Sequence, residues 1–423
     1  MQEEFLHYIW KYKKLDVIHL KTIQNESINI VSVGQHNLNS GPDFFNAQLK
    51  IGEQLWAGNV EIHIKSSDWF VHNHEIDSAY DNVILHVVWE YDTDVYGKNN
   101  TLIPTLELKN FIDEKLFDNY KNLISNQKKW INCENNFSDV NDFILNNWLE
   151  RLYFERLERK SNTIQDLLAN SKNDWEAVLF ALLAKNFGLK VNGEAFYSLA
   201  KSIDFSILRK IQSKPEVLEA LFFGQTGLLD SDFQDAYYLR LSEEYRFLKQ
   251  KFQLENRFVM PLQFFRLRPQ NFPTIRLSQL AMLYHKNHNL FSKIISMETL
   301  KEFYELFDVS TSTFWETHYT FEKQSKKTIK KLSKSFIDLI IINTILPLKF
   351  SYAKQTGQEL DDQILKIVSE IDSEDNSIIK AFNSLKKVSK SSLQSQALIQ
   401  MKSEYCDKNK CLQCAIGNSL IIK

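Results

Sequence analysis

Residues 40–69 read SGPDFFNAQLKIGEQLWAGNVEIHIKSSDW and decide the fold of the N-terminal part of the chain. A Gly-Pro turn precedes two strand-like runs that meet at Gly52-Glu53. Successive side chains of a strand face opposite sides. One side of the second run therefore carries Val60, Ile62 and Ile64, and the other carries Glu61, His63 and Lys65. A buried strand seldom places three titratable side chains on one face without a function.

A second acid, Asp43, follows the Gly-Pro turn on the neighbouring run. Two acids on adjacent strands, with a proton-handling or cationic neighbour, form an arrangement that hydrolyses phosphodiesters with magnesium. The carboxylates hold the ion, and the neighbour orients or activates water. The pattern predicts Mg²⁺ or Mn²⁺ at Asp43 and Glu61, with His63 or Lys65 positioning water.

The register of this hairpin decides whether the two acids can meet. A two-residue turn at positions 52 and 53 would set Asp43 opposite Ile62, on the apolar face. A three-residue loop, or a bulge at Gly58, would set it opposite His63. The metal site requires the second arrangement.

The motifs GPDF at 41–44 and VEIHIK at 60–65 resemble the core of the PD-(D/E)xK nuclease superfamily. The resemblance implies metal binding by Asp43 and Glu61, and a further acid from an N-terminal helix, for which Glu4 is the candidate. His63 stands where the family has its lysine, and Lys65 comes two residues later. The whole chain is also similar to a family of unknown function, with its GPDF, RPQNFP and C-terminal cysteine stretches, and that similarity implies no activity.

The flanking segments fit an α/β sandwich. Residues 2–13 have apolar residues at helical spacing, and 28–34, 83–91 and 104–109 are strand-like. Five of the ten histidines fall between His36 and His86. A metal cluster and titratable surface loops are both consistent with this density. For His72 and His74, which match no ligand-spacing motif, the surface-loop interpretation is favoured.

From about residue 138 the apolar period changes from that of strands to that of helices, with Ser138 as the expected cap of the first helix. We expect a nuclease-like α/β domain over 1–110, a connector over 111–137, an all-helical domain over 138–405 and a cysteine-bearing tail over 406–423. The predicted class is α+β, a restriction-endonuclease-like sandwich followed by a larger all-α region.

Composition is ordinary for a soluble globular protein, with 43% hydrophobic and 25% charged residues and a net charge of −2. The N-terminus lacks the pattern of a signal peptide. The apolar run 337–348 contains Asp338 and Asn343 and is too short to span a bilayer. We therefore expect a cytoplasmic protein without a membrane partner. P-loop, dinucleotide-binding, zinc-protease and α/β-hydrolase motifs are lacking.

Two basic segments are candidates for contacts with nucleic acid. Pro269 and Pro273 interrupt the helical pattern of 264–281, so its arginines are displayed from a stiff connection and either grip phosphates or bridge helical layers. The stretch 323–334 places five lysines on one expected helical face, which is either solvated or bound to phosphates. The candidate contacts are Arg266, Arg268, Arg276, Lys327 and Lys331.

The four cysteines are unevenly placed, with three near the C-terminus in the spacing C-x4-C-x2-C. Clustered thiols imply a shared soft metal, either zinc or an iron-sulfur cluster, and buried free thiols are the alternative. This grouping resembles helicase-associated nucleases, in which one upstream and three C-terminal cysteines hold a [4Fe-4S] cluster. The predicted ligands are Cys133, Cys406, Cys411 and Cys414.

The function that this sequence favours is metal-dependent hydrolysis of nucleic acid, with DNA favoured over RNA. The displaced lysine favours the alternative, a non-catalytic nucleic-acid or protein-binding module that keeps the fold. A third interpretation makes Glu61 and Lys65 a structural cross-strand pair. The mode of cleavage and the oligomeric state are not encoded in any motif.

Overall fold

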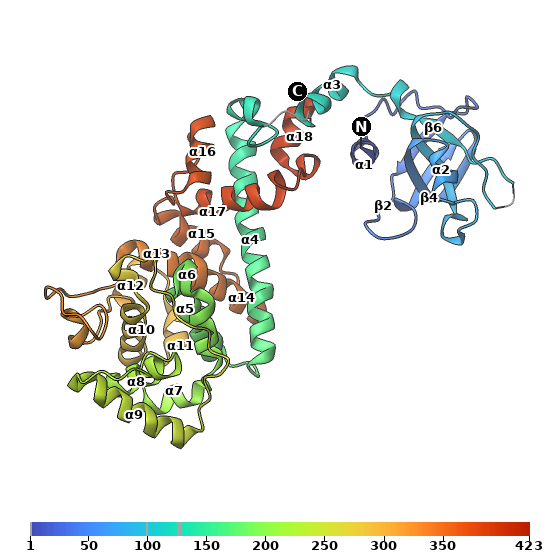
Figure 1. Ribbon diagram of the computed structural model, residues 1–423. Coiled ribbons are helices and arrows are strands. Elements are labelled where there is room, and N and C mark those ends of the chain that lie inside the picture. The colour runs from blue at the N-terminus through green and yellow to red at the C-terminus, as the bar shows by residue number, and fades with distance from the viewer. Residues whose placement is uncertain (1, 99, 125–128) are drawn as a thin grey trace. The chain divides into compact units, whose positions relative to one another are not determined.

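The computed structural model describes residues 2–98, 100–124 and 129–423, which form two compact units. The first unit comprises Met1–Trp148, Ser384–Lys386 and Gln400–Lys423, and the second comprises Leu149–Asn383 and Lys387–Ile399. The predicted α+β class is confirmed, since a mixed sheet with helices is followed by a large helical region (Figure 1).

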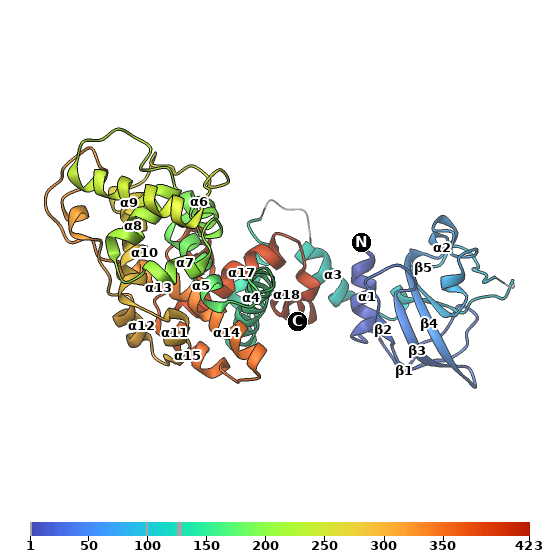
Figure 2. The ribbon, with the colours of Figure 1, turned by 90° about the horizontal axis from the view of Figure 1, so that it is seen from below.

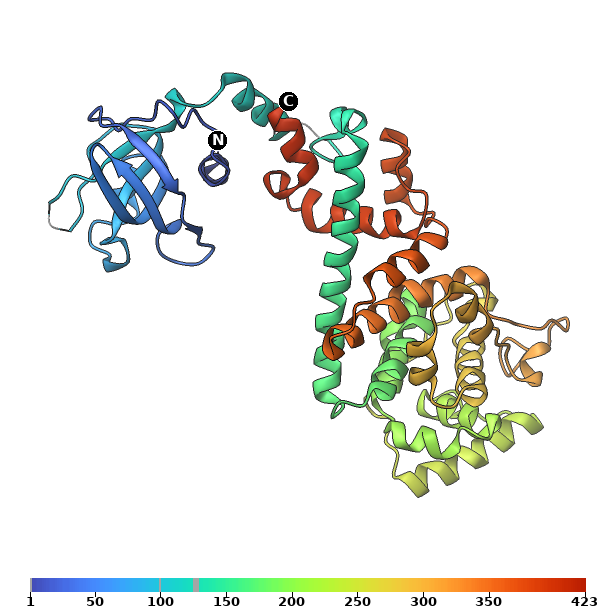
Figure 3. The same ribbon diagram turned by 180° about the vertical axis from the view of Figure 1, so that it is seen from behind.

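A mixed six-stranded sheet forms the centre of the first unit (Figures 2 and 3). Its strands are β1 (Ile28–Ser32), β2 (Gln35–His36), β3 (Phe44–Ile51), β4 (Gln54–Lys65), β5 (Val83–Glu90) and β6 (Thr105–Glu107). The order is β1-β3-β4-β5-β6, with β2 also paired to β3. The β1, β2, β3 and β4 pairings are antiparallel, whereas β4, β5 and β6 run parallel. Neighbouring antiparallel and parallel pairs thus meet at β4.

The β3–β4 register contains a bulge that the sequence did not place correctly. The turn has two residues, because Ile51 pairs with Gln54, and this register continues to the pair Ala47–Gly58. The register then shifts by one residue, so that Phe44 pairs with Val60. Asn46, with φ of 55°, adopts the left-handed conformation inside this shift. The bulge therefore lies in β3 and not at Gly58, and it brings Asp43 level with Glu61.

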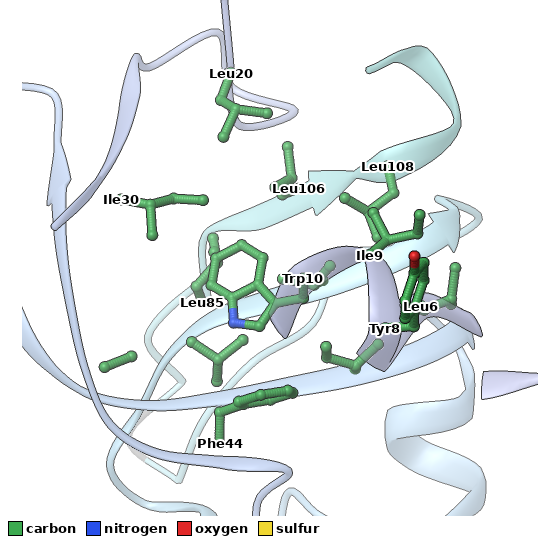
Figure 4. Packing of buried hydrophobic residues seen from close by; sticks show 14 of the residues in the cluster. Leu6, Tyr8, Ile9, Trp10, Leu20, Ile30, Phe44, Leu85, Leu106 and Leu108 are labelled. Atoms are coloured by element: carbon green, nitrogen blue, oxygen red, sulfur yellow. The ribbon is translucent and has the colours of Figure 1, made fainter. Parts of the chain in front are cut away.

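Helix α1 (Glu3–Lys11) packs on the sheet through a nearly fully buried face. Its apolar residues recur at helical spacing, as the sequence predicts. Figure 4 shows Trp10 of this helix beside Phe44 and Leu85 of the sheet. The indole of Trp10 also donates a hydrogen bond of 3.2 Å to the Val33 carbonyl. This packing fixes the helix that carries Glu3 and His7 over the sheet.

A short irregular crossover joins the parallel strands β4 and β5. It contains α2 (Asp68–Val71) and a 3₁₀ turn at Ser78–Tyr80. Asp92 anchors its start by accepting hydrogen bonds from the Ser66 hydroxyl and from the backbone and hydroxyl of Ser67. Trp69 is fully buried in a small second core. The segment that carries His72 and His74 is thus held close to β4.

The remaining helical elements of the first unit come from both ends of its sequence. They are the 3₁₀ turn Leu108–Asn110, α3 (Glu114–Ile124), the 3₁₀ turn Glu134–Asp139, the start of α4 (Asp142–Asn170), a π-helical turn at Lys402–Cys406, a 3₁₀ turn at Cys411–Gln413 and α18 (Ala415–Ile422). Leu412 and Ile421 belong to the hydrophobic core that contains α1 and the sheet. The C-terminal tail is therefore part of the first unit.

The first long helix starts later than its sequence predicts. Ser138 lies in the preceding 3₁₀ turn, and it is Asn141 whose side chain accepts the N–H of Phe143, at 2.8 Å. Phe143, in the first turn of this helix, is exposed, whereas Trp148 and Leu152 are buried. Five residues separate Phe143 from Trp148, which turns its side chain by about 140° around the helix axis, away from the stripe that Trp148 and Leu152 share.

The second unit contains the rest of α4 and a succession of shorter helices, of which α16 and α17 have their last two residues in the first unit. They are α5 (Trp175–Phe187), α6 (Leu189–Lys201), α7 (Phe205–Ile211), α8 (Pro215–Gln225), α9 (Ala236–Phe252), α10 (Pro273–Lys286), α11 (Leu290–Ser296), α12 (Leu300–Leu306), α13 (Lys334–Ile340), α14 (Leu346–Thr356), α15 (Asp361–Glu370), α16 (Ser377–Leu385) and α17 (Ser392–Met401). Pro215 occupies the first position of α8, and the side chain of Asp174 caps α5.

The lysine-rich stretch 323–332 is not the helix that its sequence predicts. It runs in an irregular, largely extended conformation, and Lys331 forms an isolated bridge with Ser310. Lys330 is buried, and its ammonium group donates hydrogen bonds to the carbonyls of Trp315 and Glu316. These tertiary bonds outweigh local helix propensity, so the lysines do not share one helical face.

The apolar run expected at 337–348 lies within a longer helical segment, Lys334–Thr356, that includes a π-helical turn at Ile341–Ile345. The segment is long and apolar enough to cross a membrane, but 72% of its most apolar window is buried inside the fold. This burial is typical of a core helix in a soluble protein.

A buried carboxyl group gives the second unit a testable pH dependence. Burial raises the pKa of Glu219 to about 7, although hydrogen bonds from Ser278, Tyr237 and Ser312 oppose the shift. Because the folded-state pKa is raised, the contribution to stability is complete below pH 4.5 and is lost as the pH rises through about 7.

We therefore expect the free energy of unfolding of the second unit to fall by on the order of 3 kcal/mol between pH 4.5 and 8 because of Glu219. Glu219→Gln should remove most of this slope in urea titrations. The control is Glu243→Gln, since Glu243 is an exposed acid of α9. An unchanged slope in Glu219→Gln would contradict the assignment.

Candidate metal centre

Three neighbouring segments of the first unit bring a carboxylate and four imidazoles together. Glu61 and His63 come from β4, His72 and His74 from the crossover after α2, and His86 from β5. The Nε2 atoms of His63 and His74 lie 3.5 and 3.3 Å from Glu61 Oε1. His63 Nε2 also lies 3.0 Å from His72 Nδ1. His63 Nε2 thus lies within 3.5 Å of both a carboxylate oxygen and a nitrogen of a second imidazole.

Both ring nitrogens of His63 face other histidines. Its Nδ1 lies 2.8 Å from His86 Nε2, opposite the contact with His72. A neutral imidazole carries one proton, so if Nδ1 donates to His86, Nε2 presents a bare lone pair to Glu61 and His72. Lone pairs that converge in this way repel one another unless a proton or a cation lies between them. His86 is then placed to orient a ligand, as outer-shell partners of metal-bound histidines do.

Asp43 joins this cluster through the backbone. Its N–H donates to Glu61 Oε2 at 3.1 Å, and its Oδ2 accepts the N–H of Ile62 at 2.9 Å. The same Oδ2 lies 3.2 Å from Nε2 of His7 on α1. The two acids therefore lie on the same side of the β3–β4 hairpin, and the bulge at Asn46 is what aligns them.

Burial dominates the electrostatics of the cluster. It lowers the pKa of His63 to about 3, with the charges of His72 and His74 contributing, and it raises the pKa of Glu61. Burial opposes the protonated form of His7, but the hydrogen bond and negative charge of Asp43 outweigh it and raise the pKa of His7. At neutral pH His63 is therefore an uncharged imidazole that can bind a metal.

The donor set determines which ions fit. One nitrogen from each of His63, His72 and His74 lies within 4.8 Å of the other two, and Glu61 adds a carboxylate oxygen. Imidazole suits transition metals, whereas an all-oxygen set suits magnesium. Glu61, His63 and His74 are buried, while His72 is exposed and leaves one side of the cluster open to solvent. The arrangement can hold a divalent transition ion that a substrate reaches from the His72 side.

Three predicted site residues, Asp43, Glu61 and His63, lie close together. Lys65 does not join them: it is exposed near the end of β4, and its charge acts on Asp92. Glu4 is also exposed, and its charge acts on Tyr120. The acid that α1 directs toward the cluster is Glu3, whose pKa is raised by burial and by Asp43.

Several residues of the cluster were missed or misassigned. The surface-loop interpretation is wrong for His74, which is 9% exposed and stacks on Tyr80 at a centroid distance of 3.7 Å. His72 is exposed, yet its ring contacts His63. The sequence did contain a signal for this cluster, the high density of histidines between His36 and His86. The surface-loop interpretation was favoured because these histidines match no known ligand-spacing motif. His7 and Glu3, four residues apart on α1, also escaped notice.

The four cysteines all line one pocket of the first unit. None forms a disulfide, and Cys414 is buried while the other three are half-buried. Burial raises the pKa of Cys133 to about 12 and that of Cys414 to about 11. Cys133 therefore lines the same pocket as Cys406, Cys411 and Cys414, the tail residues with which the sequence analysis grouped it.

The predicted nucleic-acid contacts fall into two groups. Arg276 is 7% exposed, donates to Gln279 and Asn271, and lies 3.7 Å above the ring of Phe336, so it is a structural residue and cannot grip phosphate. The exposed residues are Arg266, Arg268, Lys327 and Lys331. Of these, Lys327 lies 3.4 Å from Glu316, and Lys331 lies 3.0 Å from Asp308.

Comparison with known proteins gives a family but no activity. A family model described as a protein of unknown function, DUF2851, matches residues 3–377. No curated protein and no solved structure matches the chain. The expected similarity of the whole chain to a family of unknown function is confirmed. The match itself carries no support for a resemblance to PD-(D/E)xK nucleases.

The cluster predicts metal binding that depends on its exposed member. We expect His72→Ala to weaken binding of Mn²⁺ to the full chain by at least about tenfold, because even outer-shell substitutions cost 10- to 100-fold. His72 is exposed, so this change leaves the fold intact. Isothermal titration calorimetry would measure the affinity. The control is His19→Ala, an exposed histidine paired with Asp16, and equal affinities in the two variants would contradict the site.

Proposed function

The chain belongs to the DUF2851 family, whose function is unknown, and from its own geometry we propose that it is a metal-dependent nuclease that hydrolyses phosphodiester bonds of DNA. The observation that carries the proposal is the convergence of Glu61, His63, His72 and His74 beside Asp43. The resemblance of GPDF and VEIHIK to PD-(D/E)xK motifs supports the same assignment. The cytoplasm is the compartment we propose.

A mixed sheet preceded by a helix supports this proposal. The two acids flank the β3–β4 hairpin, β5 runs parallel to β4, and α1 covers the sheet. Such a scaffold holds ligands on strands, which position side chains more precisely than loops do. The two ligands on β4, Glu61 and His63, are both buried.

Of the two predicted ions, Mn²⁺ is the transition metal, and a donor set with three imidazole nitrogens disfavours Mg²⁺. Glu61, His63, His72 and His74 would hold the ion, which when bound supplies Lewis-acid polarisation of the scissile phosphate. His86 orients His63 through its contact with Nδ1. His7, whose Nε2 lies 3.2 Å from Asp43 Oδ2 and whose pKa Asp43 raises, would donate the proton to the leaving oxygen.

One observation favours a second candidate, a nucleic-acid-binding module without catalysis. Lys65 is exposed and outside the cluster, so the ammonium group that such nucleases use has no counterpart from this strand. The binding surface would then be the exposed basic residues of the second unit. Cleavage by the wild-type chain separates the two candidates.

Asp43→Asn should reduce Mn²⁺-dependent cleavage of duplex DNA by at least about 100-fold, because preorganised electrostatic groups at a reacting phosphate are worth that much. Asparagine keeps an acceptor for the Ile62 N–H, so folding should be preserved. Asp16→Asn, at an exposed acid outside the cluster, is the control. Lys65→Ala should retain the wild-type rate. Full cleavage by Asp43→Asn would remove the cluster from the mechanism.

The arginines of 264–268 should contribute to DNA binding through phosphates. We expect Arg266→Ala and Arg268→Ala each to reduce the slope of log K against log salt by about one, because each removes one phosphate contact. Arg257→Ala is the control, since this exposed arginine is paired with Glu255. Fluorescence anisotropy between 50 and about 200 mM salt measures the slope. Identical slopes in all variants would place the DNA elsewhere.

A further inference from the structure

The four cysteines surround a pocket that has no role in the proposed hydrolysis. One comes from the segment that precedes α4, and three come from the C-terminal tail, yet all belong to the first unit. The tail returns beside α3, where α18 packs (Figures 1 and 3). The other side chains at the pocket include the apolar Leu123, Met401 and Ile416. All four cysteines of the chain therefore line this pocket.

The spacing of the sulfur atoms indicates what the pocket holds. Four thiolates on one tetrahedral zinc, with Zn–S bonds of about 2.3 Å, lie about 3.8 Å apart. Among the described residues, no three of these cysteines have sulfur atoms that all lie within 4.8 Å of one another, whereas ligand atoms of the three histidines do. The sulfurs are thus spread more widely than one ion requires. In a [4Fe-4S] cluster each thiolate binds a different iron, which separates the sulfurs.

Two of the sulfur atoms, those of Cys411 and Cys414, accept hydrogen bonds of the kind that stabilises metal-bound thiolates. The Asn132 amide donates to Cys411 Sγ at 3.3 Å, and the backbone N–H groups of Ile416 and Gly417 donate to Cys414 at the start of α18. A Cβ at Gly417 would lie 2.1 Å from the Cys411 carbonyl oxygen, so only glycine lets the two segments approach. N–H···S bonds of this kind tune iron-sulfur centres.

We propose that Cys133, Cys406, Cys411 and Cys414 hold a [4Fe-4S] cluster that fastens the C-terminal tail to the first unit. With four protein ligands the cluster has no open position, which fits a structural role. The tail it fastens contributes Leu412 and Ile421 to the core under α1. Loss of the cluster should therefore loosen the tail before it affects the sheet.

The first test is chemical analysis of the full chain purified without oxygen. We expect about four irons and four acid-labile sulfides per chain, with a broad visible absorption that bleaches on reduction. One zinc per chain without sulfide would overturn the cluster. Metal-free protein with four thiols open to alkylation after unfolding would overturn any metal site.

The second test asks whether the cluster fastens the C-terminal tail to the first unit. Removal of iron from the wild-type protein by a chelator should raise hydrogen exchange in residues 402–423 by at least about tenfold, and leave exchange in β3 and β4 unchanged. Cys406→Ser should show the same pattern without treatment. Ser403→Ala, on the same tail, is the matched control and should retain its iron. Unchanged exchange in the tail after iron loss would overturn the fastening role.

A conservative variant separates a cluster from a merely packed group of thiols. Asn132→Ala removes the hydrogen bond to Cys411 Sγ but no ligand. Its iron content should stay at the wild-type level, while the reduction potential of the cluster shifts because that sulfur loses a donor. An unchanged potential, measured by spectroelectrochemistry, would count against Cys411 as a ligand.

Discussion

The bulge at Asn46 is the constraint on which the candidate site depends. A regular hairpin closed by the two-residue turn at Gly52-Glu53 would leave Asp43 facing Ile62 and the apolar core. One extra residue in β3, accommodated by the left-handed backbone of Asn46, turns Asp43 to the side of Glu61. Asparagine tolerates this conformation better than most residues because its short polar side chain bonds locally. A local backbone preference thus decides whether two carboxylates meet.

The polar groups gathered by this register are costly to bury. Glu61 is 5% exposed and His63 2%, and their pKa shifts show that burial disfavours the charged form of each. Groups in such surroundings are stabilised by partners or by a metal. The partners that Glu61 has are the Asp43 N–H and imidazoles whose own lone pairs compete for protons. A divalent cation would satisfy all of them at once, which supports the metal site that we propose.

The sequence predicted those features that depend on local patterns. Strand alternation placed Glu61 and His63 on one face, and the two groups of thiols implied a shared pocket. The sequence-based predictions were wrong where contacts between residues far apart in the chain determine the structure. Lys330 bonds to carbonyls of a distant turn, so its segment cannot be helical. His72 and His74 reach His63 because Asp92 anchors the crossover through Ser66 and Ser67, a contact that no sequence spacing encodes.

His63 stands on β4 where PD-(D/E)xK nucleases have a lysine, and this difference changes the charge of the site. With His63 neutral at pH 7, the donors Glu61, His63, His72 and His74 carry one negative charge in total when the other two histidines bind as neutral ligands. A divalent ion then leaves the centre with a net charge of about plus one, next to Asp43 and His7. The positive charge that attracts and stabilises a phosphate would come from the ion and from His7, whose protonated form Asp43 favours. In the proposed nuclease, the ion and His7 would therefore take the place of the ammonium group that the exposed Lys65 does not bring to the cluster.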